Sequence, residues 1–370
     1  MRRVIDKDVK SLRWIFILGL LVSCQKTTDQ QIYLAPQERS EMLLAENISS
    51  QLKICSFNIQ FLGASRVRET SALSQILKKA GCDMVVVQEL IAPPDVRRLP
   101  ASKYYGEERM PQFPGTNQEW VPNDRSTDFF ERMYEAGFDN FEMSEEDTGP
   151  GPKNHINSTA TEWWVVFFKS RKVEVHSVLP TGFVSGPLAQ NPNWDRVPYA
   201  FSFRCKNTVR ENQTDFTLLS VHLHTGATRA NALRRKAELE KLYRWIDLRK
   251  RSITERDYFI LGDMNIEDGQ ELTDVTQSTP YLSLNTLARF PTNTNPNNPR
   301  PYDHMIYNPS DSHEIAPLQN LQVLDLVKAA KAYWTSSGYP GTPYDHNRFR
   351  MSYSDHNPIA FTLSCENDDD

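Results

Sequence analysis

The feature of this chain that most restricts its fold is a repeated pattern in which a short apolar run ends at a polar, chemically active residue. Apolar runs of this length, bounded by turn residues, predict buried strands. The polar residues at or beside their ends are Asn58, Glu89, His222, Asp263, Asn265, Asp303, Asp355 and His356. Because carboxylates and imidazoles are costly to bury without partners, the pattern predicts a metal and acid–base site at one rim of a sheet.

The first elements form a strand, a helix and a second strand. Residues 52–59 alternate between apolar and polar, which predicts a strand, and residues 67–80 carry apolar side chains at helical spacing up to Gly81. Residues 84–89 begin as a continuous apolar run and end at Glu89, which predicts a buried strand. This succession is a unit of the βαβ type and indicates an α/β fold.

The rest of the chain supplies more strands, one long helix and a loop-rich stretch. Residues 91–160 are rich in Pro, Asn and Gly, which predicts a long surface insertion with one helix near 126–137. Further strands are expected over residues 162–168, 172–179, 198–205, 215–222, 258–262, 303–307 and 358–363, and the longest helix over 227–250. No linker divides residues 52–365, so one domain is expected there, followed by a solvated acidic tail over 366–370.

The charge balance excludes a chain coated with basic groups. Lys and Arg total 42 and Asp and Glu total 47, a formal net charge of −5, so any surface for a polyanion must be local. Residues 227–251 form a local excess, with nine Lys or Arg and three Asp or Glu. Either this is a solvated helix face, or Arg229, Arg234 or Arg235 steers phosphate groups toward the strand that ends at His222.

The N-terminus has the character of a targeting signal. Five basic residues precede an apolar run over residues 14–22, which is shorter than the roughly 20 residues needed to span a bilayer. The run leads into Leu21-Val22-Ser23-Cys24, which resembles a bacterial lipobox and implies cleavage before Cys24 and lipidation of its thiol. The alternatives are a plain secretory signal or a buried N-terminal helix.

A lipobox makes residues 1–23 a lipoprotein signal peptide and residues 24–51 a polar tether to the membrane. Gln25 rather than Asp follows the cysteine, so in a two-membrane bacterium the sorting rule for such proteins implies the outer membrane. Export places the protein in an oxidising compartment. The other cysteines, Cys55, Cys82, Cys205 and Cys365, have no CxxC spacing. They can form up to two disulfides, with three possible pairings, or remain small buried apolar residues.

The strand-end residues indicate an ion and a reaction. Carboxylate and amide oxygens suit a hard cation, so Mg²⁺ is expected, with Mn²⁺ or Ca²⁺ as alternatives. The residues that offer such oxygens are Glu89, Asp355, Asp263, Asn58 and Asn265. His222 and His356 can act as general acid or base, and Asp303 or Glu162 can hold an imidazole in one tautomer. This set predicts metal-assisted attack on phosphorus.

These residues, in this order, resemble the endonuclease/exonuclease/phosphatase superfamily in its deoxyribonuclease-like form. The motifs are Phe57-Asn58-Ile59-Gln60, Val86-Val87-Gln88-Glu89, Glu162 before an aromatic strand, Arg196-Val197-Pro198, Val221-His222-Leu223-His224, Gly262-Asp263-Met264-Asn265, Tyr302-Asp303-His304-Met305-Ile306 and Ser354-Asp355-His356. The resemblance spans residues 52–365 and implies a four-layer α/β sandwich of two mixed β-sheets flanked by helices. It also implies that Glu89 holds the divalent cation, with Asn58 and Asp355 nearby.

The same resemblance implies catalytic roles. His222, paired with Glu162, and His356, paired with Asp303, would flank the scissile phosphate as acid or base. The remaining members of the set are Asp263, Asn265 and Arg196. The first two would orient water or phosphate or help to hold a second metal ion, and Asn265 and Arg196 would contact the phosphate.

Two positions depart from the deoxyribonuclease branch, which places Arg two residues after the metal-binding Glu and Tyr two residues before the Glu that opens the aromatic strand. Here these positions are Ile91 and Ala160, so the nucleic-acid contacts of that branch are not carried over. We expect a monomeric, divalent-metal-dependent phosphodiesterase that acts as a nuclease on DNA or RNA. The alternatives are a sphingomyelinase-like or other phosphate-ester hydrolase, and a non-catalytic binding module on the same fold.

Overall fold

The structure, a computed structural model, describes residues 50–64, 67–148, 161–184, 194–206, 213–316, 319–366 and 368. The chain divides into two compact units, residues 1–46 and 47–370, and every described residue belongs to the second. The predicted signal peptide, Cys24 and most of the predicted tether therefore lie outside the described residues. None of the described helices has the length and apolar character needed to cross a bilayer.

The described strands form two mixed sheets. The first has the order β12 (Gln322–Val323), β13 (Ile359–Ser364), β1 (Gln51–Leu62), β2 (Met84–Leu90), β4 (Trp163–Phe168) and β3 (Asn140–Met143). The second has the order β10 (Leu282–Ser283), β11 (Asp303–Tyr307), β9 (Tyr258–Asp263), β8 (Asp215–His222), β7 (Tyr199–Cys205) and β5 (Val173–Val175), and β6 (Gly182–Phe183) also pairs with β7. The pairs β1–β2 and β8–β9 are parallel, and the other pairs are antiparallel.

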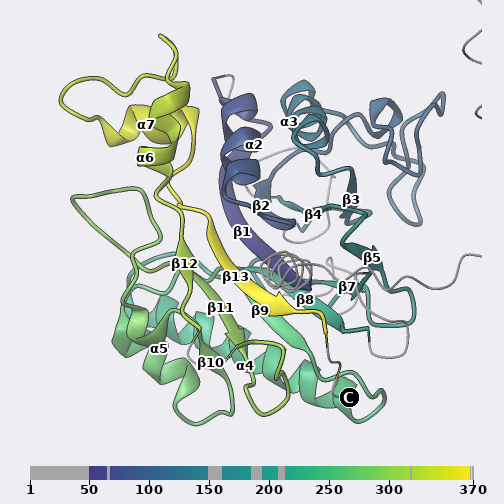
Figure 1. The fold of residues 1–370 in the computed structure, drawn as a ribbon, viewed down its shortest axis with the longest axis vertical. Helices are drawn as coiled ribbons and strands as arrows, with labels where there is room; N and C mark the ends of the chain where they lie inside the picture. The colour runs from purple at the N-terminus through teal and green to yellow at the C-terminus, as the bar shows by residue number, and fades with distance from the viewer. Residues whose placement is uncertain are drawn as a thin grey trace, which may run out of the picture. The chain divides into compact units, whose positions relative to one another are not determined.

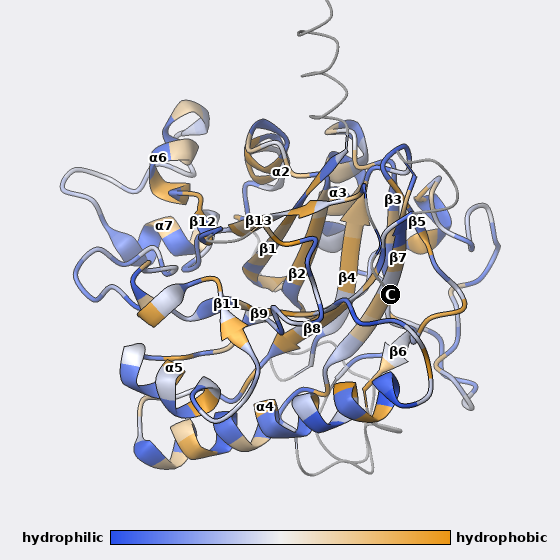
Figure 2. Ribbon diagram, turned by 60° about the horizontal axis from the view of Figure 1, so that its bottom comes forward, coloured by the Kyte–Doolittle hydropathy of each residue, from blue (hydrophilic) through white to orange (hydrophobic). Residues whose placement is uncertain are grey.

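Helices cover the outer faces of both sheets. The α-helices are α2 (Thr70–Lys79), α3 (Asp124–Glu135), α4 (Arg229–Lys250), α5 (Gly269–Thr276), α6 (Leu326–Ala330) and α7 (His346–Ser352). Short 3-10 turns are η1 (Val96–Arg98), η4 (Thr286–Ala288) and η5 (Lys331–Tyr333). In Figure 1, α2 and α3 lie on the side of the first sheet and α4 and α5 on the side of the second, and Figure 2 shows the same layers from another direction.

Alternation along the central strands fills three apolar layers. Val86 and Trp164 point between the sheets, where they meet Phe203 and Leu261 of the second sheet. Their neighbours point outward: Val85, Val87, Trp163 and Val165 pack under α2 and α3, and Leu219, Val221 and Ile260 pack under α4 and α5. Strands buried on both faces carry continuous apolar runs, as residues 84–87 do. The four-layer α/β sandwich predicted from the sequence is confirmed.

The stretch over residues 91–160 contains the one predicted helix, α3, and largely exposed loops before it, but part of the stretch belongs to the core. Phe129 and Phe130 of α3 are buried, and their rings lie 5.6 and 4.6 Å from the ring of Phe167 on β4. β3 adds an edge strand to the first sheet. The prediction is therefore confirmed for the helix and wrong in placing it at the surface, because the apolar side chains of α3 cover the outer face of the first sheet.

Disulfides join the cysteines of the described residues in one of the three predicted pairings. Cys55 bonds Cys82, which ties β1 to the turn before β2, and Cys205 bonds Cys365, which ties β7 of the second sheet to the end of β13 in the first. The second bond closes a loop of sequence separation 160, and a long closed loop restricts the unfolded chain strongly. Both bonds are buried in the apolar layers.

Candidate active site

The sheet topology explains why distant strand ends meet. The parallel strands β1 and β2, and likewise β8 and β9, end on the same side, and the antiparallel strands β4, β11 and β13 begin there. The register places Asp263 opposite both His222 and Asp303. The same rim receives Glu89 from β2 and His356 from the segment before β13. The sequence pattern and the strand directions thus produce one shared site.

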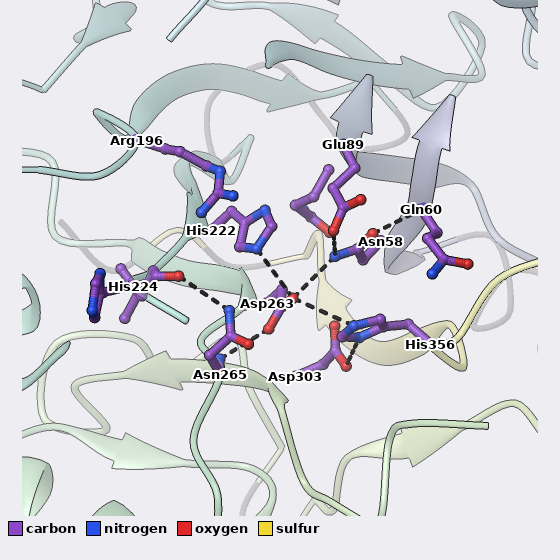
Figure 3. A network of polar contacts seen from close by, with 12 residues as sticks. Asn58, Gln60, Glu89, Arg196, His222, His224, Asp263, Asn265, Asp303 and His356 are labelled. Carbon is purple, nitrogen blue, oxygen red and sulfur yellow. Dashed lines mark hydrogen bonds and ion pairs between the residues drawn. The ribbon is translucent and has the colours of Figure 1, made fainter. Parts of the chain in front are cut away.

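Asp263 lies at the centre of this site and is buried. Its Oδ2 accepts a hydrogen bond from Asn58 Nδ2 at 3.0 Å. The same oxygen lies 3.4 Å from Nε2 of His222 and 3.4 Å from Nε2 of His356. Figure 3 shows the two imidazoles approaching Asp263 from opposite sides. One carboxylate oxygen therefore faces both candidate acid–base residues.

Each imidazole is oriented by a carboxylate on its other nitrogen. His222 Nδ1 lies 2.8 Å from Glu162 Oε1, and His356 Nδ1 is hydrogen-bonded to Asp303 Oδ2 at 2.8 Å. Arg196 contributes its Nε to an ion pair with the same Glu162 oxygen. The two pairings implied by the sequence resemblance are present, and Arg196 lies behind His222 as the counter-charge of Glu162.

The charges at these pairs favour protonated imidazoles. Burial and the Arg196 charge oppose protonation of His222, but Glu162 and Asp263 outweigh them and raise its pKa. Burial opposes protonation of His356 too, and Asp303 and Asp263 raise its pKa well above 6.5. Burial disfavours the charged form of Glu162, yet His222 and Arg196 lower its pKa to about 2. Glu162 is therefore an anion at any pH of interest, and both histidines hold protons readily.

Glu89 is the residue whose surroundings most favour a cation. Its Oε1 accepts from Asn58 Nδ2 at 2.8 Å and its Oε2 from the backbone N–H of Phe61 at 2.9 Å. Burial raises the pKa of Glu89, the positive charge of His222 opposes this shift, and the negative charges of Glu162 and Asp355 add to it. Its backbone has φ of +62°, a strained conformation for a residue with a side chain. A bound cation would relieve the repulsion between these carboxylates.

Two groups of side chains among the described residues around this site have ligand atoms within 4.8 Å of one another. One consists of Glu89, His222 and Asp263, and the other of Asp263, Asp303 and His356. Carboxylate-rich sets of this kind suit a hard divalent ion such as Mg²⁺. The donor set at Glu89 and Asp263 therefore fits the divalent cation implied by the sequence resemblance.

The other predicted site residues lie close by in different roles. Asn58 directs its nitrogen to both Glu89 and Asp263, while its Oδ1 accepts from the backbone N–H of Gln60 at 2.9 Å. The backbone N–H of Asn265 donates to Asp263 Oδ1 at 2.9 Å. Asp355 is half-buried, lies 3.8 Å from Arg350 and is not part of either described ligand group. Direct coordination by Asn58 or Asp355 stays a prediction.

Arg68 lies beside the candidate site, and no sequence pattern signalled it. It is 6% exposed, and it donates to the carbonyl of Arg350 at 2.8 Å and to the carbonyls of Tyr353 and Gln60. Burial lowers its pKa to about 10, and the charges of Asp355 and Glu89 act in the opposite direction. Arg68 thus joins the segment after Asn58 to the segment before His356. A lone Arg between a strand and a helix carries no motif, so only the folded chain reveals it.

The hypothesis that Arg235 steers phosphates is wrong. Arg235 is fully buried, donates to Glu271 at 2.6 and 2.9 Å, and donates to the carbonyls of His224 and Gly226 at 3.0 and 2.7 Å. The Arg235 guanidinium therefore joins α4 to the loop that follows β8. Neighbouring Arg234 lies 3.1 Å from Asp195, which also pairs with His224. His224 thereby positions the loop that carries Arg196. The His222-Leu223-His224 motif in the sequence does not predict this role.

The chain matches the model of the endonuclease/exonuclease/phosphatase family over residues 55–356. No curated protein sequence is significantly similar to it. Among solved structures, an endonuclease/exonuclease/phosphatase family protein from Bacteroides thetaiotaomicron has a TM-score of 0.48 and 14% identity, with 85% of this chain and 97% of that chain covered. A mannosyl-6-phosphatase from Bacteroides thetaiotaomicron VPI-5482 has a TM-score of 0.47 and 13% identity, with 84% of this chain and 98% of that chain covered.

A truncated TDP2 from Caenorhabditis elegans is also similar, with a TM-score of 0.44 and 13% identity over 85% of this chain and 97% of that chain. The family model covers most of the sequence and includes every strand-end residue from Asn58 to His356. The sheets, the two imidazole–carboxylate pairs and the Glu89 carboxylate are placed as the sequence motifs require. The chain belongs to the endonuclease/exonuclease/phosphatase family.

Proposed function

We propose that this protein is a divalent-metal-dependent phosphodiesterase and that its substrate is DNA or RNA. The observation that carries the proposal is the position of Asp263, whose Oδ2 lies 3.4 Å from Nε2 of both His222 and His356. Two imidazoles that face one carboxylate oxygen, each held from behind by its own carboxylate, supply acid, base and charge stabilisation in one buried site. Membership of a family named for nucleases and phosphatases supports phosphorus as the centre of reaction.

The side chains of the site have different proposed roles in the reaction. Glu89, with Asp263, would hold the cation, Mg²⁺ being the expected ion, and a bound divalent cation neutralises charge on the phosphate oxygens. Asp263 is placed to orient a water molecule and accept its proton. His356, kept protonated by Asp303, is placed to stabilise a phosphoryl oxygen or to donate a proton to the departing oxygen. His222 and Arg196, with Glu162 between them, add positive charge on the opposite side.

The substrate is the finer part of the proposal. Ile91 is buried, so the position at which the deoxyribonuclease branch carries an arginine offers no contact to nucleic acid here. Any contact to a strand must therefore come from other parts of this surface. Because Ile91 supplies no contact to nucleic acid, a lipid-type or small phosphate ester is the second candidate substrate class.

The location is a proposal as well. Lipidation of Cys24 would attach the protein to the bacterial envelope, at the outer membrane, as a monomer on a polar tether. The two disulfides support an oxidising compartment, because such bonds persist outside the cytoplasm.

The test is hydrolysis by the purified protein of plasmid DNA, RNA, sphingomyelin and bis(p-nitrophenyl) phosphate, with Mg²⁺, Mn²⁺ or Ca²⁺ and with a chelator. The proposal expects cleavage of a nucleic acid that the chelator abolishes and Mg²⁺ restores. Cleavage of sphingomyelin alone would replace nucleic acid by lipid as the substrate. The absence of all hydrolysis with every ion would favour a non-catalytic binding module.

A further inference from the structure

A groove of about 870 Å³ opens beside the candidate active site. One wall is the loop over residues 291–299, and the other is formed by α6 and the chain that follows it to Tyr344. Figures 1 and 2 show α6 and α7 beside each other at one edge of the described unit. The volume lies within the range of sites that bind small molecules or single nucleotides.

The groove lies next to the catalytic rim. Asn357, the residue after His356, lines the groove, and its Nδ2 donates to the carbonyl of Asn293 at 2.9 Å. Asn293 also forms a β-bridge with His356 itself. The backbone N–H of Thr294, another lining residue, donates to the carbonyl of Asp355 at 2.7 Å. A strand whose scissile phosphate lies beside His356 would therefore pass close to this groove.

Aromatic side chains line the groove wall. Trp334 and Tyr344 are half-buried, Tyr339 is 38% exposed, and the rings of Trp334 and Tyr339 meet edge to face at 5.4 Å. Trp334 Nε1 is buried and has no hydrogen-bond partner among the described residues, so the ring offers its face rather than this nitrogen. Aromatic faces with polar edges are surfaces on which unpaired bases stack. Paired bases cannot present their faces, so this wall suits a single strand.

Positively charged side chains also line the groove, although the chain as a whole has a negative net charge. Lys328 and Lys331 are exposed and line it. The acidic residue on the same wall, Asp325, accepts from the backbone N–H of Lys328 at 2.9 Å and so caps α6. Lysines beside an aromatic wall suit a phosphate backbone, whereas a lipid acyl chain would call for an apolar groove without amides and charges.

We infer that this groove binds the single-stranded nucleic acid that continues from the scissile phosphate on the His356 side. An unpaired base stacks on Trp334 or Tyr344, and the backbone phosphates lie near Lys328 and Lys331. The inference rests on the proposed phosphodiesterase function and names its substrate as an unpaired strand. The inference assigns substrate specificity to residues 326–345. This segment contributes no residue to the catalytic rim.

The test compares two substrates in matched variants. We expect Trp334→Ala to lower kcat/KM for a single-stranded oligonucleotide by about 5- to 100-fold, because stacking contributes that much per base. Hydrolysis of bis(p-nitrophenyl) phosphate, which does not reach the groove, should change less than about twofold. Trp334→Phe should retain most of the activity on the oligonucleotide. The control is Trp245→Ala, which removes a half-buried tryptophan from α4 on the other face of the fold.

The lysines are tested by their salt dependence. Replacing Lys328 and Lys331 by Gln should weaken oligonucleotide binding and reduce the slope of log Kd against log salt, since fewer counterions are released. Lys78→Gln, an exposed lysine of α2, should leave the slope unchanged. Equal losses on both substrates in Trp334→Ala, or no loss on either, would overturn the groove assignment.

A binding measurement separates this inference from the proposed function. The anisotropy of a labelled oligo-dT of about 12 nucleotides, measured with chelator, reports the groove without catalysis. Binding lost in Trp334→Ala, in a protein that hydrolyses no ester, would support the groove and refute the proposed function. Hydrolysis of bis(p-nitrophenyl) phosphate without any binding of oligo-dT would refute the groove and leave a phosphodiesterase with another substrate.

Discussion

His356 Nδ1 is hydrogen-bonded to Asp303 Oδ2 at 2.8 Å, although the two residues are 53 positions apart and belong to different sheets. Asp303 opens β11 of the second sheet, and His356 precedes β13 of the first. The pair therefore forms only when the sheets are packed face to face. It fixes the imidazole so that Nε2 faces Asp263.

Asp303→Asn should lower kcat about 10²- to 10⁴-fold, the usual contribution of a positioned acid or base. Asp303 raises the pKa of His356, so its loss should lower that pKa. If the protonated imidazole is the active form, the fall in activity at rising pH should move to lower pH. The measurement is a pH profile of kcat/KM for the variant and the wild type. An unchanged rate and profile would exclude this pair from catalysis.

Glu89→Gln should abolish metal-dependent hydrolysis, because it removes one negative charge from the ligand group that includes His222 and Asp263. Calorimetric titration with Mg²⁺ or Mn²⁺ should show affinity reduced by more than the 10- to 100-fold typical of losing a supporting partner of a ligand. Glu142→Gln on β3 is the matched control and should bind the ion normally. Wild-type affinity in Glu89→Gln would place the ion elsewhere.

Arg68→Ala should destabilise the fold by about 3 kcal/mol, because three backbone carbonyls lose their donor inside the protein. It should also lower kcat more than it raises KM, since the segments that carry Asn58 and His356 lose their common anchor. Arg68→Lys should recover little, because an ammonium group cannot reach all three carbonyls as a guanidinium does. Urea unfolding and steady-state kinetics measure both effects.

Arg244→Ala, a change at an exposed residue of α4, serves as the control for charge alone. If Arg68→Ala and Arg244→Ala are equally stable and equally active, Arg68 has no positioning role.

His304 should make stability depend on pH. Burial lowers its pKa to about 4, so it stays neutral in the folded protein, while the unfolded chain protonates below about 6.5. The unfolded state then binds more protons, and the free energy of unfolding should fall by up to about 3 kcal/mol between pH 6.5 and pH 4. Urea unfolding with chelator at several pH values should show a smaller fall in His304→Gln. Parallel curves for the two proteins would contradict the assignment.

Cys24→Ser should release the protein from the membrane fraction if the lipobox is used. The thiol would be the site of lipidation, so the variant should lack the lipid and run as an unprocessed or soluble form. Cell fractionation with metabolic labelling by a fatty acid measures the change, and Cys82→Ser, which affects a disulfide, is the comparison. Unchanged fractionation and labelling would remove the anchor from the proposal.

The sequence predicted the parts of the site that depend on strand ends. Glu89, His222 and Asp263 each follow an apolar run, and parallel strands carry such ends to one rim. The four-layer fold followed from the family resemblance, and the family model supports it. Local sequence and strand direction suffice for the strand-end residues, whereas the fold needed the family resemblance.

Other features depend on long-range packing that no local pattern expresses. Four cysteines allow three pairings, and only the approach of β7 to β13 selects Cys205 with Cys365. Arg235 and Arg68 look like ordinary surface cations in the sequence, yet both are buried where carbonyls and carboxylates of distant segments need donors. The burial of Phe129 and Phe130 could not be predicted from their own stretch. They pack on Phe167 of β4, more than thirty positions later in the sequence.

The Cys205–Cys365 bond joins the second sheet to the last strand of the first, close to the end of the described chain. Cys205 can therefore form this bond only after the 160 further residues up to Cys365 have been synthesised. A nascent chain released early would lack β13 and carry a reactive sulfur able to couple with other molecules. Oxidative folding of the domain is thereby linked to synthesis of β13, and a catalyst of thiol–disulfide exchange should raise the yield of folded protein in a refolding experiment.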